Sequence, residues 1–544
     1  MRSWRGVPEP AAAPALGIGI AGAVLVFAVL CGVWMSQPPY RPIDEASHVA
    51  YARELSHGRL PTIDSPMSAD GDPRLARLLR SRDAVHRTIW TANHPPLYYA
   101  LAAVPLRIAE ATGHPIRGLL AARLLSTGLS ALGLVALAYT VLQLVPDRPQ
   151  LVVAATGLTA VLPSFINVGT VVYNDSLAFL TSTCALAAVV VLVIRGPSAT
   201  RLAAVAATVA LAALTRASGL LVAGVAVLAV FLAAWRAGQG TVRRRLVRAG
   251  GWASVLMVTV VATAGWFYLR NRTLYGDPTG SAALLERFGR VPHGSVPELL
   301  GQPNFWGSQH QRLWGVTTNL PGSGGPLSRQ LWLLGLLPLA GLLVAGARWL
   351  RRLPDRARPP DPGRTAAFAL CLLLLGLLEL SLVQFVSQGG GAHVRYLFPA
   401  LVAVGLAAAV GLAALPGGRW GLPTAAMLVV MSLADLWVRW RYLGVIGVTA
   451  RPPLLLLVVP PLLLGLGLQA LALWRLRPGA APHSRNVGQA RLRRGWPPTP
   501  VRNIGCDGVV ADHPPTVSGA GTWRVPISRW PSAARPGRRA GRWP

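Results

Sequence analysis

Long apolar runs recur along most of this chain, and most polar residues lie between them. Up to residue 475 the runs are about 18–25 residues long, enough for a helix to cross a hydrocarbon core of roughly 30 Å. A backbone in lipid has to satisfy its own hydrogen bonds, so such runs predict helices. We expect about twelve transmembrane helices, near residues 16–36, 118–145, 150–172, 175–195, 200–215, 217–235, 250–269, 329–350, 366–386, 396–415, 421–438 and 453–475.

Two segments between these runs are too long to be simple connectors. They are a first exterior loop at 37–117 and a second at 270–328, and both carry aromatic residues. Within the first loop, residues 44–57 and 95–111 predict short surface helices. The second of these is apolar but short, so we interpret it as interfacial; if it crossed the membrane, the orientation of everything after it would reverse.

The first apolar run predicts a retained membrane helix, because it is longer than the core of a signal peptide.

The pattern of apolar runs ends after residue 475. Residues 476–544 are rich in Pro, Gly and Arg without periodicity, which predicts a disordered basic cytoplasmic tail behind a membrane domain at 1–475. The alternative is a tail with no role.

Arginines are concentrated in alternate short loops, around 195–201, 236–248 and 348–364. Positive charge is enriched on the cytoplasmic side, so we expect these loops and both termini to be cytoplasmic in a multi-pass plasma-membrane protein. The acidic residues indicate the same orientation. Eight of the twenty Asp and Glu lie in the first exterior loop: Asp44, Glu45, Glu54, Asp64, Asp70, Asp72, Asp83 and Glu110.

Composition supports the membrane interpretation. The chain is 52% hydrophobic and 13% charged. Its formal charge of +32 comes from arginine without any lysine, and no folded basic domain is visible, so we expect no nucleic-acid partner. The four cysteines are scattered and predict neither a disulfide framework nor a metal site.

The strongest candidate for chemistry is the acidic pair Asp44-Glu45, just after the first apolar run. On a helix, Asp44, His48 and Tyr51 share one face. A carboxylate there could take a proton from an acceptor as a general base, and it could also hold a divalent cation. Helix capping is the structural alternative.

Further candidates lie where predicted helices meet the exterior. His94 and Tyr98 flank a Pro-Pro helix start, and Asn174-Asp175 begins a membrane helix, where capping is the favoured explanation. Arginine suits phosphate because its planar group makes two charge-assisted bonds. Four arginines at helix ends are candidates for phosphate binding, although they could instead extend to the membrane interface: Arg216, Arg270, Arg272 and Arg395.

The chain contains no convincing nucleotide-binding or hydrolase motif, so any transferase here needs a donor that arrives through the membrane. The order of several short blocks resembles GT-C membrane glycosyltransferases, notably glycosyltransferase family 39 and the aminoarabinose transferases. The blocks are Asp44-Glu45 with His48 and Tyr51, His94-Pro95-Pro96-Leu97-Tyr98-Tyr99, Asn174-Asp175-Ser176, Thr215-Arg216-Ala217-Ser218-Gly219, Gly265-Trp266-Phe267-Tyr268-Leu269-Arg270, Tyr275-Gly276-Asp277-Pro278 and Arg395-Tyr396-Leu397-Phe398-Pro399.

The resemblance implies an all-α GT-C fold and transfer of a sugar from a polyprenyl-phosphate donor to a cell-envelope glycan, lipid or protein on the exterior face, with inversion. It implies that Asp44 activates the acceptor with help from Glu45, and that His94 and Arg395 lie near the donor phosphate. His48, Tyr51, Tyr98, Asn174, Asp175, Arg216, Arg270 and Tyr396 complete the expected substrate site. No soluble C-terminal domain follows, unlike in larger relatives.

Two other functions remain open. A transporter or flippase of lipid-linked sugars would favour internal repeats and broken helices at mid-membrane. No convincing repeat is visible, and the acids lie outside the predicted spans. The other alternative is a noncatalytic membrane scaffold with a folded surface loop.

Overall fold

The computed structural model describes residues 12–40, 44–69, 72–238, 240–315, 331–351, 361–445 and 451–478. The predictions for the basic tail from residue 479 onward therefore lie outside the described residues. Across the described part the chain is helical, and its β structure is limited to one isolated antiparallel bridge between Pro66 and Thr88.

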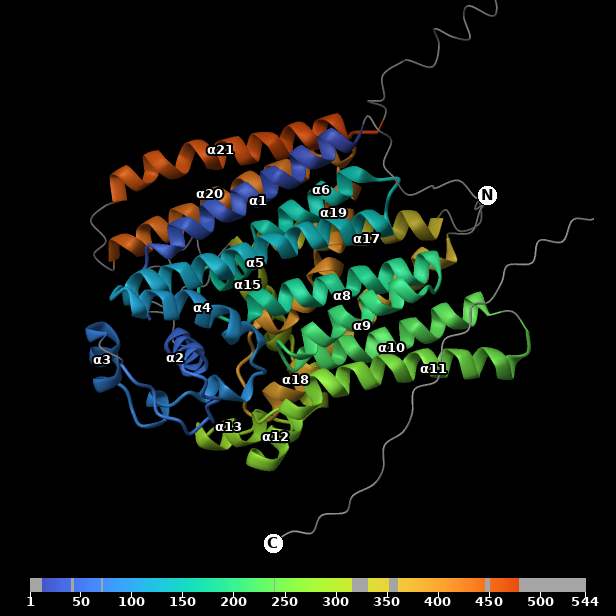
Figure 1. The fold of residues 1–544 in the computed structure, drawn as a ribbon. Helices are drawn as coiled ribbons and strands as arrows, with labels where there is room; N and C mark the ends of the chain where they lie inside the picture. The colour runs from blue at the N-terminus through green and yellow to red at the C-terminus, as the bar shows by residue number, and fades with distance from the viewer. Residues whose placement is uncertain are drawn as a thin grey trace, which may run out of the picture. The chain divides into compact units, whose positions relative to one another are not determined.

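Ten helices in the described part are long and apolar enough to cross a membrane, and Figure 1 shows the long helices lying roughly parallel. They are α1 (Ala13–Met35), α5 (Pro115–Leu144), α8 (Asp175–Arg195), α10 (Ser218–Ala237), α11 (Val242–Val260) continued by η3 (Val261–Gly265) and α12 (Trp266–Tyr275), η4 (Leu331–Gly335) with α17 (Leu336–Arg351), α18 (Pro362–Ser387), η5 (Val394–Ala400) with α19 (Leu401–Ala414), α20 (Leu422–Val445) and α21 (Arg451–Arg475).

The other two predicted spans take different forms. The run at 150–172 is α6 (Pro149–Ala160) followed by α7 (Pro163–Gly169), which meet at a bend of 65°. Pro163 has no N–H to continue the helix, which favours a break there. The run at 200–215 is α9 (Ala199–Ala213), shorter than a typical crossing. The all-α polytopic fold class is confirmed.

The two predicted loops are folded into short helices. The first loop segment, residues 36–114, carries α2 (Glu45–Ser56), α3 (Pro73–Arg80), η1 (Val85–Arg87), η2 (Trp90–Asn93) and α4 (Leu97–Ala111). The second, residues 276–315, carries α13 (Ser281–Arg287), α14 (Val296–Leu300) and α15 (Pro303–Trp314). In Figure 1, α2, α3, α4 and α13 gather at one end of the long helices, which we call the loop end.

Hydrogen bonds tie the first loop segment to the end of α12 and to the second loop segment. Arg270 of α12 donates to the carbonyl of Pro61 at 2.7 Å, and the hydroxyl of Tyr275 accepts from the backbone of Ile63 at 3.1 Å. Asn93 donates to the carbonyl of Thr279 at 3.0 Å. Segments far apart in sequence therefore form one continuous surface at the loop end.

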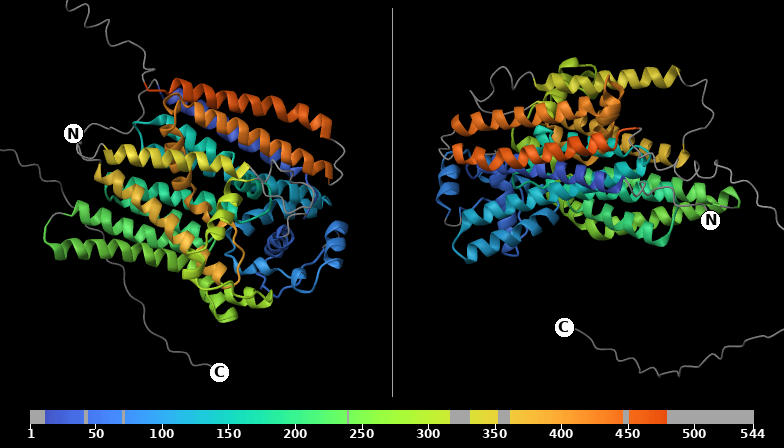
Figure 2. Two further views of the ribbon diagram at one scale, coloured as in Figure 1. Left: turned by 180° about the vertical axis from the view of Figure 1, so that it is seen from behind. Right: turned by 90° about the horizontal axis from the view of Figure 1, so that it is seen from above.

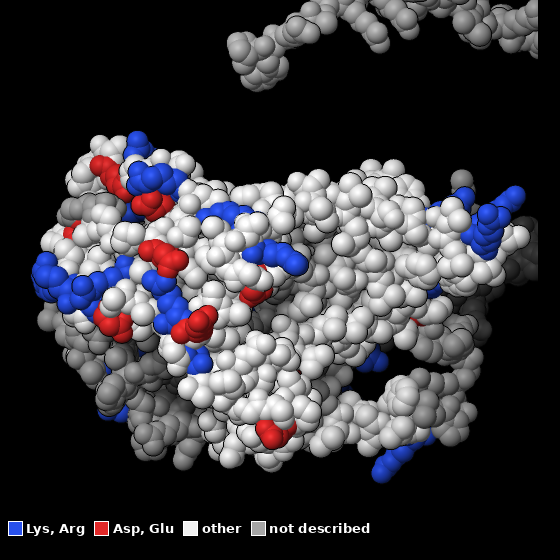
Figure 3. Space-filling model, turned by 90° about the horizontal axis from the view of Figure 1, so that it is seen from below, with Lys and Arg blue, Asp and Glu red and all other residues white. Residues whose placement is uncertain are grey.

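The arginine-rich connections lie together at the opposite end of the long helices. Arg195 donates to Gln143, and Arg364 forms an ion pair with Asp147, so these connections contact one another. Figure 3 shows a broad band with few charges between a mixed acidic and basic end and a mostly basic end. This distribution agrees with the division into two sides that the sequence predicts.

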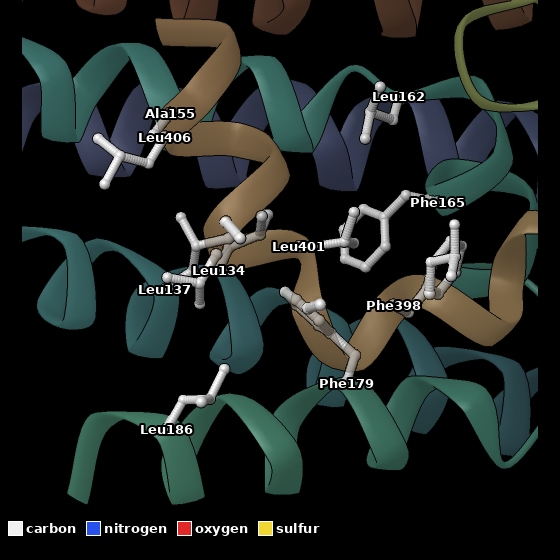
Figure 4. Close-up of a cluster of buried hydrophobic side chains, with 14 of the residues drawn as sticks. Leu134, Leu137, Ala155, Leu162, Phe165, Phe179, Leu186, Phe398, Leu401 and Leu406 are labelled. Carbon is white, nitrogen blue, oxygen red and sulfur yellow. The ribbon is translucent and has the colours of Figure 1, made fainter. Parts of the chain in front are cut away.

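Aromatic packing links the bent α6–α7 segment to the helices that carry the site (Figure 4). The ring of Phe165 in α7 packs against Phe179 of α8 at 4.8 Å and against Phe398 of η5 at 5.6 Å. All three side chains are fully buried. Figure 2 shows from behind that α1, α20 and α21 run side by side next to this core.

Candidate active site

A cavity of about 770 Å³ lies at the loop end. Its walls come from the start of α2, residues 86–94, the start of α10, the second loop segment, and the end of α18 with the turn that follows it. Six of the twelve predicted site residues line it: Asp44, His48, His94, Arg216, Arg395 and Tyr396.

Two acids and two arginines alternate on the floor of the cavity. Nη2 of Arg395 donates to Oδ2 of Asp44 at 2.9 Å, and Nη1 of Arg395 lies 4.0 Å from Oδ2 of Asp175. Arg216 pairs with Oδ1 of Asp175. We call Asp44, Arg395, Asp175 and Arg216 the ion-pair chain. Asp44 is its most open member, with 27% of its side chain exposed, whereas Asp175 is buried beneath the arginines.

Local structure explains how these side chains meet. Asp175 is the first residue of α8, where the helix dipole favours a negative charge. Arg216 lies in the short turn between α9 and α10. The guanidinium of Arg395 lies 5.2 Å from the ring centroid of Tyr173, and that of Arg216 lies 4.9 Å from the ring of Tyr396. These cation–π contacts hold both arginines where they border the cavity.

Two histidines stack beside the ion-pair chain. The rings of His48 and His94 are nearly parallel, with centroids 6.3 Å apart, and Nδ1 of His48 lies 2.8 Å from the hydroxyl of Tyr99. Burial lowers the pKa of both imidazoles, and the charges of Arg216 and Arg395 lower the pKa of each further. Both histidines are therefore neutral at neutral pH.

Glu45 does not border the cavity, although the sequence predicts that it assists Asp44. Its carboxylate is fully buried and accepts from Arg123 of α5, at 2.8 Å from Nε and 2.5 Å from Nη2. It also accepts from the backbone N–H groups of Tyr40 and Val172. With its oxygens bonded in this way, the geometry favours a structural role for Glu45.

Four other predicted residues lie outside the cavity lining and support its walls. The hydroxyl of Tyr51 donates to the carbonyl of His94 at 3.0 Å, and Asn174 donates to the carbonyl of Thr215, next to Arg216, at 3.3 Å. Tyr98 bonds to Ser126 at 2.7 Å, and Arg270 joins α12 to the first loop segment. These side chains position the lining residues and do not themselves face the cavity.

The cavity continues as an apolar crevice between two membrane helices. Ser381 and Gln384 of α18 lie among the residues that line this part, but most of its side chains from α10 and α18 are apolar: Leu220, Leu221, Leu378, Leu382 and Phe385. It is continuous with the part lined by Arg216 and Arg395. One cavity thus combines a cationic floor with an apolar extension toward the band that has few charges.

Sequence reasoning missed two functional candidates. His393 lines the cavity two residues before Arg395, and burial, together with the charge of Arg395, lowers its pKa to about 4. Arg123, the partner of Glu45, lies inside an apolar run. An arginine within a predicted span is a signal that could have identified it.

The predicted divalent cation finds no fitting donor set. Among the residues that the structure describes, no group of three or more His, Cys, Asp or Glu is placed to hold a metal ion. The carboxylates of Asp44 and Asp175 are instead paired with Arg395 and Arg216, and these guanidinium groups supply the positive charge next to them.

Comparison with known proteins found distant structural similarity. A scan against protein-family models found no match, and neither did a search of curated proteins. Among solved structures, an oligosaccharyltransferase from Archaeoglobus fulgidus in its apo form matches 83% of this chain at 13% identity, with a TM-score of 0.42. ArnT from Cupriavidus metallidurans bound to undecaprenyl phosphate matches 84% at 17% identity, with a TM-score of 0.41.

A third match is the archaeal oligosaccharyltransferase AglB in complex with an inhibitory peptide and a dolichol-phosphate, at 14% identity and a TM-score of 0.39. The chain spans 56% of the first archaeal structure and 77% of ArnT. The TM-scores of these matches all lie between 0.39 and 0.42, so they show distant similarity only and do not assign this chain to a family. The function of this chain is therefore inferred from its own site.

Proposed function

We propose that this chain is a membrane glycosyltransferase that moves a sugar from a polyprenyl-phosphate donor to a cell-envelope acceptor. The observation that carries this proposal is the cavity itself, where two arginines and an open carboxylate adjoin an apolar crevice between α10 and α18. A lipid phosphate has the matching composition, with an anionic head and an isoprenoid chain.

Arg216 and Arg395 are suited to the donor phosphate. Both line the cavity, and Nε of Arg395 is a buried donor with no hydrogen-bond partner among the described residues. A guanidinium presents several N–H groups in one plane, so it can bind a phosphate while keeping a carboxylate partner. These cations would stabilise the negative charge that develops on the leaving phosphate.

Asp44 is the proposed general base. Its Oδ2 is bonded to Arg395, and its side chain is open enough to meet a nucleophile. The acceptor oxygen or nitrogen forms a bond to the anomeric carbon while the bond from that carbon to the phosphate oxygen breaks. The phosphate leaves with the bonding electron pair, and the acceptor proton passes to the carboxylate of Asp44. Direct displacement of this kind inverts the anomeric centre.

Glu45 and Arg123 are assigned to positioning. Besides its bonds to Glu45, Arg123 donates to the carbonyls of Met35 and Gln37, in the connection that leads from α1 to Asp44. The pair therefore holds the chain at the end of α1 in place. We place the loop end on the exterior face of the plasma membrane, with both termini in the cytoplasm.

Substituting the two neighbouring acids tests the assignment. Asp44→Asn keeps the shape of a partly open side chain, so we expect normal expression with loss of sugar transfer. Glu45→Gln leaves Arg123 without its full charge partner, and breaking a buried pair costs about 3–5 kcal/mol, so we expect loss of folded protein.

Transfer is measured by comparing cell-envelope glycans of a deletion strain complemented with each variant. Binding of undecaprenyl phosphate to the purified full chain in nanodiscs is measured alongside. Retained transfer in Asp44→Asn contradicts the base assignment. Movement of lipid-linked sugar across the membrane without any transfer indicates the flippase alternative.

A further inference from the structure

The outer wall of the cavity carries an aromatic cluster that the proposed transfer chemistry does not use. His86 and Trp90 come from the first loop segment, and Phe288 follows α13 in the second. Their rings meet edge to face, with centroids 5.7 Å apart for His86–Trp90, 5.3 Å for His86–Phe288 and 5.9 Å for Trp90–Phe288. We call these three residues the outer wall.

Asp83 holds the imidazole ring of His86 in place. Oδ1 of Asp83 accepts from Nδ1 of His86 at 2.6 Å and from its backbone N–H at 2.9 Å. These two bonds lower the pKa of Asp83 and hold the ring with Nδ1 toward the carboxylate. Nε2 is the ring nitrogen that is left for a hydrogen bond with a ligand.

A charged side chain near His86 acts electrostatically on the proposed base. Arg82, in the same turn as Asp83 and His86, interacts electrostatically with Asp44 and Tyr173. Hydroxyl and amide side chains line the same cavity, namely those of Thr91, Asn93, Thr279 and Ser281. Asn93 is held in place by its bond to Thr279.

The remaining parts of the cavity already have matching occupants under the proposed function. The arginines of the ion-pair chain match a phosphate, and the crevice between α10 and α18 matches an isoprenoid chain. The outer wall, which both loop segments build, is the part left for the second substrate.

We infer that the outer wall is the acceptor subsite and that its ligand is a saccharide. This inference rests on the proposed function and names the acceptor class for the same site. Aromatic rings offer apolar surface for the C–H face of a sugar ring, and Nε2 of His86 together with nearby hydroxyl and amide groups suits several hydroxyls.

A peptide acceptor fits this wall less well. Peptides commonly bind by adding a strand to an open sheet edge, or as a helix in an apolar groove. In the loop segments as far as the structure describes them, β structure is limited to the bridge between Pro66 and Thr88. The outer wall therefore offers side chains for recognition and no backbone edge.

Saturation-transfer NMR on the full chain in nanodiscs containing undecaprenyl phosphate tests the subsite. The probes are the methyl glycosides of glucose, galactose and mannose, with the peptide acetyl-Ala-Ser-Thr-Ala-amide as comparison. We expect a signal from at least one glycoside. His86→Ala removes one hydrogen bond, so we expect binding to weaken by roughly tenfold.

Phe288→Leu keeps an apolar side chain but loses the ring, and a comparable loss is expected. His114→Ala is the matched control, because His114 is an exposed histidine that does not line the cavity. Unchanged glycoside binding in both outer-wall variants, a signal from the peptide alone, or no glycoside signal overturns the inference. Retained binding of undecaprenyl phosphate in the same samples shows that the failure concerns the acceptor subsite and not the proposed donor site.

Discussion

At the scale of single residues, the site places neutral imidazoles against permanent positive charge. His48 is buried beside Arg216 and Arg395, with His94 stacked on it. A proton on either ring would face two guanidinium groups. Arg216 and Arg395, which suit an anionic substrate, can therefore lie this close to the two histidines only while both imidazoles are uncharged.

This arrangement predicts a loss of stability on acidification. The pKa of His48 is lowered in the folded protein, whereas in the unfolded chain it returns toward its ordinary value of 6.5. The unfolded state then binds more protons as the pH falls below about 6.5, so the stability present above that value is lost progressively.

Thermal unfolding of the protein in nanodiscs between about pH 7 and about pH 5 measures this effect. We expect the melting temperature to fall on acidification, and to fall less in His48→Gln, which cannot take up a proton. His114→Gln is the exposed control. Equal slopes for the wild type and His48→Gln would show that His48 does not contribute.

At the scale of helices, close backbone contacts fix how the membrane helices cross. A Cβ built on Gly411 of α19 would overlap the carbonyl oxygen of Pro338 in α17, and one on Gly341 would overlap the carbonyl of Gly411. Small residues permit this approach in membrane helices. α19 continues directly from η5, which carries Arg395. The crossing of α17 and α19 therefore also affects the position of Arg395 in the site.

Gly411→Val therefore forces α17 and α19 apart. We expect a loss of about 1–3 kcal/mol in the free energy of unfolding, the usual cost of overpacking. Gly376→Val in α18 is the control, because a Cβ at Gly376 would meet no atom within 4 Å. Unfolding in a denaturant series compares the two, and equal stability would contradict the packing argument.

Most helices could be predicted from the sequence, because the length of an apolar run alone separates a crossing from a connector. The bend between α6 and α7 could not be predicted. Proline is tolerated inside membrane helices, so Pro163 alone does not show that the helix breaks there. α11 begins at Val242, inside an arginine-rich stretch that we expected to be a loop. Hydropathy does not detect a helix that continues into a polar region.

The candidate site was only partly predictable for a related reason. Asp44 and Arg395 are recognisable singly, as charges at the ends of apolar runs, but their pairing joins positions 351 residues apart. Nothing local distinguishes Asp44, which faces the cavity, from Glu45, which is held by Arg123. His86 and Phe288 of the outer wall belong to different loop segments, so their contact could not be predicted without the folded structure of both.

At the scale of the whole molecule, function depends on which side of the membrane the loop end faces. The charged residues divide into a mixed end, where the cavity lies, and a mostly basic end, with the band of few charges between them (Figure 3). Because positive charge is enriched on the cytoplasmic side of membrane proteins, we propose that the basic end faces the cytoplasm. A polyprenyl-phosphate sugar would then be used at the exterior surface, where cell-envelope acceptors are found.

Two single cysteines test this orientation in intact cells. Cys31, Cys184 and Cys371 lie in membrane helices, and replacing Cys506 with Ser removes the remaining thiol. Ser81 is exposed at the loop end and Thr200 at the basic end. We expect a membrane-impermeant maleimide to label Ser81→Cys in intact cells, and Thr200→Cys only after lysis. The reverse pattern would place the cavity in the cytoplasm, and transfer to an envelope acceptor would then be excluded whatever the chemistry of Asp44.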